Sequence, residues 1–238
     1  MMMTSSLDDP HERYARAAAR AGLTLHHLDP GDASLRAGLA EWERLARTFL
    51  GADELDAETR SRLEDDLRIV EELRRVLAGD EPGEGTARER ELWVVRGAGR
   101  MQGVCSLFEC PGGVFIELLA TAPWNLVRGA RGRDLRAVPG VGRALLAQVA
   151  ELSELNGHGG RVALQAENPR CLELYRRLGF ALMQPEDGPL ALVPRGEHGW
   201  SASLLRVAAG KPGDEEARSP WLVLDQARAA EQARRVAA

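Results

Sequence analysis

The chain has 238 residues, and its 31 Lys and Arg against 36 Asp and Glu give a formal net charge of −5. Hydrophobic residues make up 44% and charged residues 28% of the sequence, a composition that is typical of folded globular proteins and excludes general disorder. A chain of this length can bury a substantial core without disulfides or metal, as one large domain or two small ones.

Apolar runs, the beginning of the chain and the cysteines favour a cytoplasmic protein. Runs such as Phe115–Ala120 fall far short of the roughly 20 residues that a membrane helix needs. The polar, acidic start Met1–Asp9 resembles neither a signal peptide nor a transit peptide. The 3 cysteines include no CxxC motif, which favours a reducing compartment. A mildly acidic chain is also a poor nucleic-acid binder, because that binding depends mainly on neutralising phosphates. We therefore expect neither a membrane nor a nucleic acid as a partner.

The first third of the chain is predicted to be mainly helical. Residues 1–22 form a helical arm, and Leu23–Leu28 forms a short strand. Two amphipathic helices follow, one from Ala33 to about Leu50 and one that starts after Asp56 and closes at Gly79. The acidic face of the latter helix is interpreted as solvated surface; it carries Asp65, Asp66, Glu71 and Glu72.

After residue 88 the hydrophobic period changes from helical to strand-like. Three consecutive strands are expected to be antiparallel, and helices alternate with strands after them. The expected elements are strands Leu92–Val95, Met101–Glu109 and Val114–Thr121, helix Val141–Asn156, strand Arg161–Ala166, helix Pro169–Leu178, and a hairpin of Phe180–Met183 and Leu190–Val193.

This order of elements predicts a mixed α/β (α+β) fold, with a largely antiparallel sheet flanked by helices. The order does not suit a doubly wound parallel sheet, which would need regular alternation of strands and helices. We expect a helical arm at 1–22, a main domain at 23–194 and an extension at 195–238 that ends in a helix. The extension either packs on the domain or forms a homodimer contact.

Two glycine clusters are candidates for phosphate-binding loops. Gly97-Ala98-Gly99 lies between two predicted strands and is interpreted as a hairpin turn, because a dinucleotide-binding loop must precede a helix. Pro139-Gly140-Val141-Gly142-Arg143 does open a helix, where unpaired N–H groups favour phosphate. By itself the second cluster is equally consistent with a simple loop-to-helix cap.

Two further segments carry motifs that flank this second cluster. Ile116–Pro123 reads Ile-Glu-Leu-Leu-Ala-Thr-Ala-Pro, and Asn168–Phe180 follows the pattern N-x-x-C-x-x-L-Y-x-x-x-G-F. Together, and in this order, the three segments resemble the GNAT superfamily of acyl-CoA-dependent N-acyltransferases. That family has I-E-x-L-A-V-x-P and N-x-x-A-x-x-L-Y-x-x-x-G-F, so Thr121 and Cys171 are departures. The resemblance covers roughly residues 23–194.

The resemblance implies acetyl-CoA as cosubstrate and direct transfer of its acetyl group to a primary amine, on a small molecule or a protein, in a ternary complex. The end of the predicted strand Val114–Thr121 would hold the pantetheine arm and polarise the thioester carbonyl. The glycine loop would bind the pyrophosphate through its amides, and Asn168 would lie along the pantetheine. The cofactor-binding residues so implied are Leu119, Ala120, Thr121, Gly140, Val141, Gly142, Arg143 and Asn168.

The reaction needs a base and an acid. An amine must be neutral to attack a thioester, although alkyl amines have pKa values near about 10, and the departing thiolate benefits from a proton. The resemblance implies that Tyr175 protonates the CoA sulfur and that Glu117 is the base, directly or through water. The alternatives are a core aromatic for Tyr175 and a salt-bridged structural glutamate for Glu117.

The chain departs from the family before the glycine loop, where residues 124–138 are inserted. Ala137 stands where the family usually has Gln or Arg, so either Arg136 takes over that role in cofactor binding or the loop relies on its amides alone. The inserted arginines either contact the CoA 3′-phosphate, an acidic substrate or a partner, or form a solvated loop. They are Arg128, Arg131, Arg133 and Arg136.

No metal site is expected, because His26 and His27 point to opposite faces of a strand and the cysteines show no ligand spacing. The main rival to an enzyme is a catalytically silent GNAT-fold module that senses CoA or binds a protein. Nucleic-acid binding is disfavoured further, since no aromatic platform accompanies the arginines. The sequence does not indicate which amine is the acceptor.

Overall fold

The fold is described from a computed structural model of the chain. The structure describes residues 22–52, 55–79, 90–110, 113–129, 132–133, 136–183 and 220–224. The predicted N-terminal arm up to residue 21, the predicted strand Leu190–Val193 and the predicted terminal helix lie outside these ranges.

The described strands form a seven-stranded sheet of order β1-β2-β3-β4-β7-β9-β8 and a small separate ribbon, β5-β6. Strand β1 pairs antiparallel with β2, and β9 pairs antiparallel with β7 and β8, whereas β4 and β7 are parallel. The predicted mixed α/β fold with a largely antiparallel sheet is therefore confirmed. The bounds of the strands are β1 Thr24–Leu28, β2 Arg90–Gly97, β3 Arg100–Cys110, β4 Gly113–Thr121, β5 Arg128–Gly129, β6 Gly132–Arg133, β7 Val162–Gln165, β8 Ala181–Leu182 and β9 Trp221–Leu224.

Five helices accompany these strands within the described ranges. They are α2 Ala33–Leu50, α3 Ala57–Ala78, α4 Pro123–Leu126, α5 Val141–Leu155 and α6 Pro169–Arg177. The chain divides into two compact units. Of the described residues, unit 1 contains Phe108–Glu117, 146–183 and 220–224, and unit 2 contains 22–107 and 118–145. Strands β3 and β4 and helix α5 contribute residues to both units.

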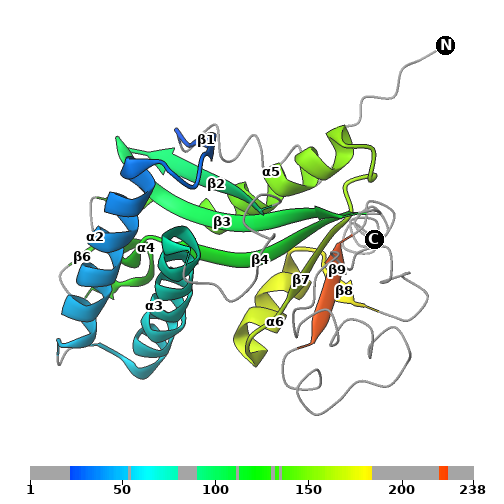
Figure 1. Ribbon diagram of the computed structural model, residues 1–238. Coiled ribbons are helices and arrows are strands. Elements are labelled where there is room, and N and C mark those ends of the chain that lie inside the picture. Colours follow the sequence, from blue (N-terminus) through cyan, green and yellow to red (C-terminus); the bar gives the residue numbers. More distant parts are fainter. Residues whose placement is uncertain are drawn as a thin grey trace. The chain divides into compact units, whose positions relative to one another are not determined.

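In unit 2 the helices α2 and α3 lie side by side (Figure 1). Each begins at an aspartate. The carboxylate of Asp32 accepts from the backbone N–H of Ser34 at 2.7 Å, and that of Asp56 accepts from the N–H of Thr59 at 2.8 Å. Gly79 ends α3 with a φ of +77°, which favours glycine. The inner faces of both helices pack with β2, β3, β4 and α4 around Leu35, Leu39, Trp42, Leu73, Leu92, Val104, Ala120 and Trp124.

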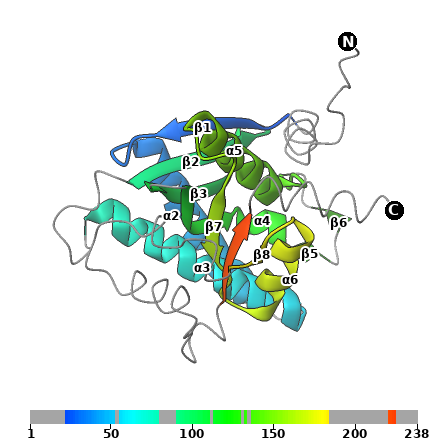
Figure 2. The same cartoon turned by 90° about the vertical axis from the view of Figure 1, so that its right-hand side faces the viewer.

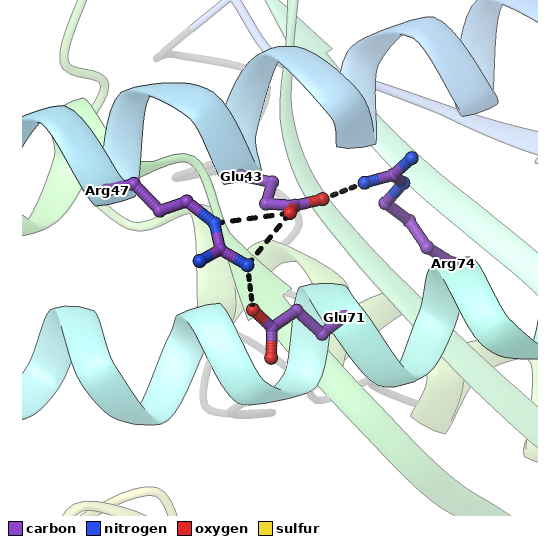
Figure 3. Close-up of polar contacts among 4 residues, drawn as sticks. All are labelled: Glu43, Arg47, Glu71 and Arg74. Carbon is purple, nitrogen blue, oxygen red and sulfur yellow. Dashed lines mark hydrogen bonds and ion pairs between the residues drawn. The ribbon is translucent and has the colours of Figure 1, made fainter.

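Charged side chains join α2 and α3 at their outer side (Figure 3). The Arg47 guanidinium donates to Glu43 at 3.0 Å and to Glu71 at 2.7 Å, while Arg74 pairs with the other carboxylate oxygen of Glu43. Glu71, which was predicted to be solvated surface, therefore takes part in an ion-pair cluster. Because both arginines are exposed and both glutamates are only half-buried, solvent screens these ion pairs and the cluster adds little stability.

The β2–β3 connection confirms the predicted hairpin turn. Ala98 has a φ of +51° and Gly99 a φ of +72°, so both central residues are left-handed, as in the type I′ turn that is common between twisted antiparallel strands.

In unit 1, strand β9 lies between β7 and β8 (Figure 2). Its four residues are buried, and the Trp221 ring lies 5.0 Å from that of Phe115. The sequence prediction had paired Phe180–Met183 with Leu190–Val193 and had assigned no strand to 221–224. The core of this unit comprises Phe108, Phe115, Ala163, Met183, Trp221 and Val223.

Candidate active site

The candidate strand β4 pairs with β7 over a short stretch. Val114–Ile116 are in parallel register with Val162–Leu164, and Glu117 follows directly after the last paired residue. Beyond it β4 continues to Thr121, and Leu118 and Ala120 pack into the core of unit 2. Glu117 is half-buried.

The end of β4 is joined to α3 by a side chain that was predicted to be solvated. Asp66 accepts from the backbone N–H of Thr121 at 3.3 Å and from its hydroxyl at 3.2 Å. The interpretation of Asp66 as plain solvated surface is therefore wrong: the carboxylate replaces a strand neighbour for this N–H. The resemblance assigned the backbone of Thr121 to the cofactor, and here its N–H is directed to Asp66.

The second glycine cluster forms the entrance to α5. Gly140 has a φ of +83°, which a side chain would strain, and its carbonyl accepts the first helical hydrogen bond from Ala144 at 2.9 Å. A Cβ atom built on Gly140 or Gly142 would meet no described heavy atom within 4 Å. The first N–H groups of a helix have no acceptor within the helix. This loop therefore combines such donors with open space beside both glycines.

Gly103 on β3 brings two predicted cofactor segments together. A Cβ atom at this position would lie 2.5 Å from Val141 Cγ1, 2.9 Å from Leu145 Cδ1 and 3.6 Å from the Ala120 carbonyl oxygen. The first turn of α5 thus packs directly on β3, beside β4. Sequence reasoning missed this role, although a glycine inside a strand indicates a close approach of backbone.

The insertion 124–138 is partly built into the core rather than only solvated. Trp124, in α4, is 1% exposed and meets Trp42 edge-on, with ring centroids 6.3 Å apart. The guanidinium of Arg136 lies 5.0 Å from the centroid of the Trp124 ring. Arg128 and Arg133 are register partners in the β5–β6 ribbon. The cofactor role of Arg136 stays a prediction, and Arg131 lies outside the described residues.

The spacing of the α6 motif follows from helix capping. Asn168 is the N-cap, and its side-chain oxygen accepts from the N–H of Cys171 at 2.9 Å. At the other end Phe180 donates to the Tyr175 carbonyl at 3.0 Å and Gly179 to the Arg176 carbonyl at 3.1 Å, with Gly179 at a φ of +98°. This pair of hydrogen bonds is a Schellman motif. The Gly-Phe that follows the tyrosine thus ends the helix: Gly179 adopts the left-handed φ, and Phe180 provides the second hydrogen bond.

The same cap holds the Tyr175 ring. Its centroid lies 5.7 Å from that of Phe180, and the side chain is half-buried. This hydrophobic contact is the one that accompanies a Schellman motif, and it limits the directions in which the phenol can point. Tyr175 was interpreted either as the acid that protonates the CoA sulfur or as a core aromatic. The structure does not decide between these roles, because the ring packs on Phe180 and the residue is still partly exposed.

The predicted residues fall into two groups. Unit 1 contains Glu117, Asn168 and Tyr175, whereas unit 2 contains the end of β4, Arg136 and the glycine loop. Cys105, which the resemblance does not use, is fully buried, and burial raises the pKa of its thiol to about 12. It is therefore a thiol at neutral pH and is unsuited to carry an acyl group.

Among the described residues, no group of three or more His, Cys, Asp or Glu side chains is arranged to hold a metal ion. None of the helices in the same ranges combines the length and the apolar composition that crossing a membrane requires.

Several solved structures resemble this chain. A protein from Desulfovibrio desulfuricans that is assigned to the GNAT family of acetyltransferases has 16% sequence identity and a TM-score of 0.43, over 86% of this chain and 99% of that one. PaiA N-acetyltransferase from Thermoplasma acidophilum, in complex with coenzyme A, has 12% identity and a TM-score of 0.44, over 85% and 98%. The ribosomal-protein-S18-alanine N-acetyltransferase from Escherichia coli has 14% identity and a TM-score of 0.43, over 85% and 92%. The sequence matches no family model and no curated protein.

Proposed function

We propose that the chain is a GNAT-type N-acyltransferase, which transfers the acetyl group of acetyl-CoA to a primary amine in a ternary complex. The observation that carries the proposal is the close packing of the start of α5, which follows the glycine loop, against Gly103 of β3. Gly103 allows the start of α5 to pack beside the Ala120 carbonyl, so the two segments that the resemblance assigns to pyrophosphate and pantetheine are neighbours in unit 2.

The chemistry of the loop supports binding of a phosphate group. The positive end of the α5 dipole and the N–H groups of Val141, Gly142 and Arg143 favour an anion. The open space beside Gly140 and Gly142 lets that anion approach the backbone closely. Arg143 is exposed, and its guanidinium adds positive charge at the same turn.

The proposed reaction forms one bond and breaks another. The neutral amine attacks the thioester carbon, the new C–N bond forms, and the C–S bond breaks. Glu117 takes a proton from the amine, directly or through water, and Tyr175 donates its phenolic proton to the departing sulfur. Both residues are half-buried, and the proposal requires each of them to exchange its proton with solvent afterwards.

The first test is binding of CoA, measured by isothermal titration calorimetry. Gly140→Asp should weaken binding at least about 10-fold, because it adds bulk and negative charge where pyrophosphate is proposed to lie. Gly79→Asp is the matched control: Gly79 also has a left-handed φ, +77°, and open space, but it ends α3. Equal affinity of Gly140→Asp and wild type would contradict the loop assignment.

The second test is release of CoA thiol from acetyl-CoA across a panel of small amines and peptides with free amino groups. Turnover with any of them supports the enzyme and identifies the acceptor class. Binding of CoA without turnover on the panel would favour a catalytically silent module that senses CoA.

A further inference from the structure

A buried polar cluster connects β3 with the insertion. Gln102 is 0% exposed. Its amide nitrogen donates to the carbonyl oxygens of Gly97 at 2.9 Å and Arg136 at 3.1 Å. Its amide oxygen accepts from Trp124 Nε1 at 2.9 Å and from Asn125 Nδ2 at 3.2 Å. A glutamine amide has two donors and two acceptor sites, so this side chain is fully satisfied.

Asn125 completes the connection from the other side. Its amide nitrogen also donates to the backbone carbonyl of Gln102 at 3.2 Å, and its amide oxygen accepts from the backbone N–H of Val138 at 2.8 Å. The backbone of residues 136–138 is therefore held at two points, the Arg136 carbonyl and the Val138 N–H. Only Pro139 separates this segment from Gly140.

The start of α5 is thus fixed from two neighbouring residues of β3. Gly103 provides the contact surface for Val141 and Leu145, and Gln102 holds the chain that enters the loop. Backbone N–H groups cannot adjust to a ligand as a long side chain can, so the affinity of an anion site made of them depends on where the backbone is held. Ala137 offers no polar side chain of its own, which increases this dependence.

We propose that Gln102 and Asn125 are positioning residues of the glycine loop: they hold residues 136–138 so that the Gly140–Arg143 amides point at the pyrophosphate of CoA. The inference rests on the proposed function, because that function supplies the ligand. It also gives the insertion a role that the resemblance lacks, since α4 delivers Asn125 to the cluster.

The test compares two ligands by calorimetry: CoA, and adenosine 3′-phosphate 5′-diphosphate, the fragment of CoA that keeps the pyrophosphate and lacks pantetheine. The variants are Gln102→Met, which keeps the length of the side chain without hydrogen bonds, and Asn125→Ala, which keeps the protein testable if the buried substitution impairs folding. Trp124→Phe is the matched control, because it removes one hydrogen bond from the same amide and leaves both bonds to residues 136–138 in place.

We expect Gln102→Met and Asn125→Ala each to weaken binding of CoA and binding of the fragment by the same factor. That factor is about 10-fold, which corresponds to one well-formed hydrogen bond. Trp124→Phe should lower the melting temperature while both dissociation constants stay within about 2-fold. A purely structural role would instead change the melting temperature in all three variants and leave binding alone.

Three results would overturn the inference: unchanged binding in Gln102→Met and Asn125→Ala, weakening limited to CoA, or equal weakening in Trp124→Phe. A wild-type protein that binds CoA but not the fragment would also overturn it while leaving the proposed function intact. A wild-type protein that binds neither ligand would refute the proposed function itself, before any variant is compared.

Discussion

At the scale of single residues, the phenol of Tyr175 is held by the end of its own helix. The Schellman motif at Gly179 and Phe180 supports the ring from one side, so removing the hydroxyl should leave the fold unchanged. This allows the chemical role of the hydroxyl to be separated from the packing role of the ring.

We predict that Tyr175→Phe lowers kcat about 10²-fold, the usual contribution of a general acid, with CoA affinity and melting temperature near wild type. Steady-state thiol release with the acceptor found in the panel measures it. Tyr14→Phe is the control, since the chain has 2 tyrosines and both variants lose one hydroxyl. An unchanged kcat in Tyr175→Phe would remove this residue from the mechanism.

Sequence analysis could name only candidate site residues that lie within short motifs. Asn168 and Tyr175 are recognisable because their spacing reflects helix capping, which is a local property of the chain. Asp66 and Gln102 were missed because their partners lie far along the chain: Thr121 is 55 residues from Asp66, and Arg136 is 34 residues from Gln102. No local pattern reports such contacts.

At the scale of elements, the first turn of helix α3 is stabilised by its N-cap residue, Asp56. The backbone N–H and then the hydroxyl of Thr59 donate to the carboxylate of Asp56, and these hydrogen bonds lower the pKa of Asp56 below its ordinary 3.8. A carboxyl whose pKa is lower in the folded state stabilises the fold above its unfolded pKa. That contribution disappears as the pH falls through the folded pKa.

We therefore predict that Asp56→Ala lowers the melting temperature at neutral pH and that the difference from wild type narrows as the pH falls below about 4. Circular dichroism melts between pH 2 and pH 8 would measure it. Asp56→Asn keeps an accepting oxygen without a titrating group, so it should differ from Asp56→Ala at every pH. A gap between wild type and Asp56→Ala that persists undiminished to pH 2.5 would contradict the prediction.

Most elements could be predicted because their ends are encoded locally. Both α2 and α3 begin directly after a capping aspartate, and the periodic apolar residues define their faces. Strand β9 could not be predicted in the same way. Leu190–Val193 and Trp221–Leu224 are both short apolar runs, and the pattern of a run does not tell which strand it will pair with. The pairing of β9 with β7 and β8 is determined by tertiary contacts that the local sequence does not encode.

At the scale of the whole molecule, β9 ties the predicted extension 195–238 to the sheet. Trp221, Leu222, Val223 and Leu224 are at most 4% exposed. Burying four such side chains contributes about 1.5–3 kcal/mol each. The total approaches the whole stability of a typical domain, about 5–15 kcal/mol.

Two truncated chains that differ by five residues isolate this contribution. We predict that residues 1–224 unfold cooperatively, whereas residues 1–219, which lack β9, do not. Thermal unfolding followed by circular dichroism, together with size-exclusion chromatography, would distinguish them. Equal melting temperatures of the two chains would show that β9 is dispensable.

The position of β9 also has a consequence for synthesis on the ribosome. Translation produces β7 and β8 first. Strand β9, which lies between them in the sheet, is made only after a further 38 residues, 183–220. Until residue 224 has left the exit tunnel, the edge of β7 has no neighbour on that side within the described sheet. Unit 1 therefore completes its sheet only after residue 224 has been made, and its exposed strand edge during that interval is a site where nascent chains can pair wrongly.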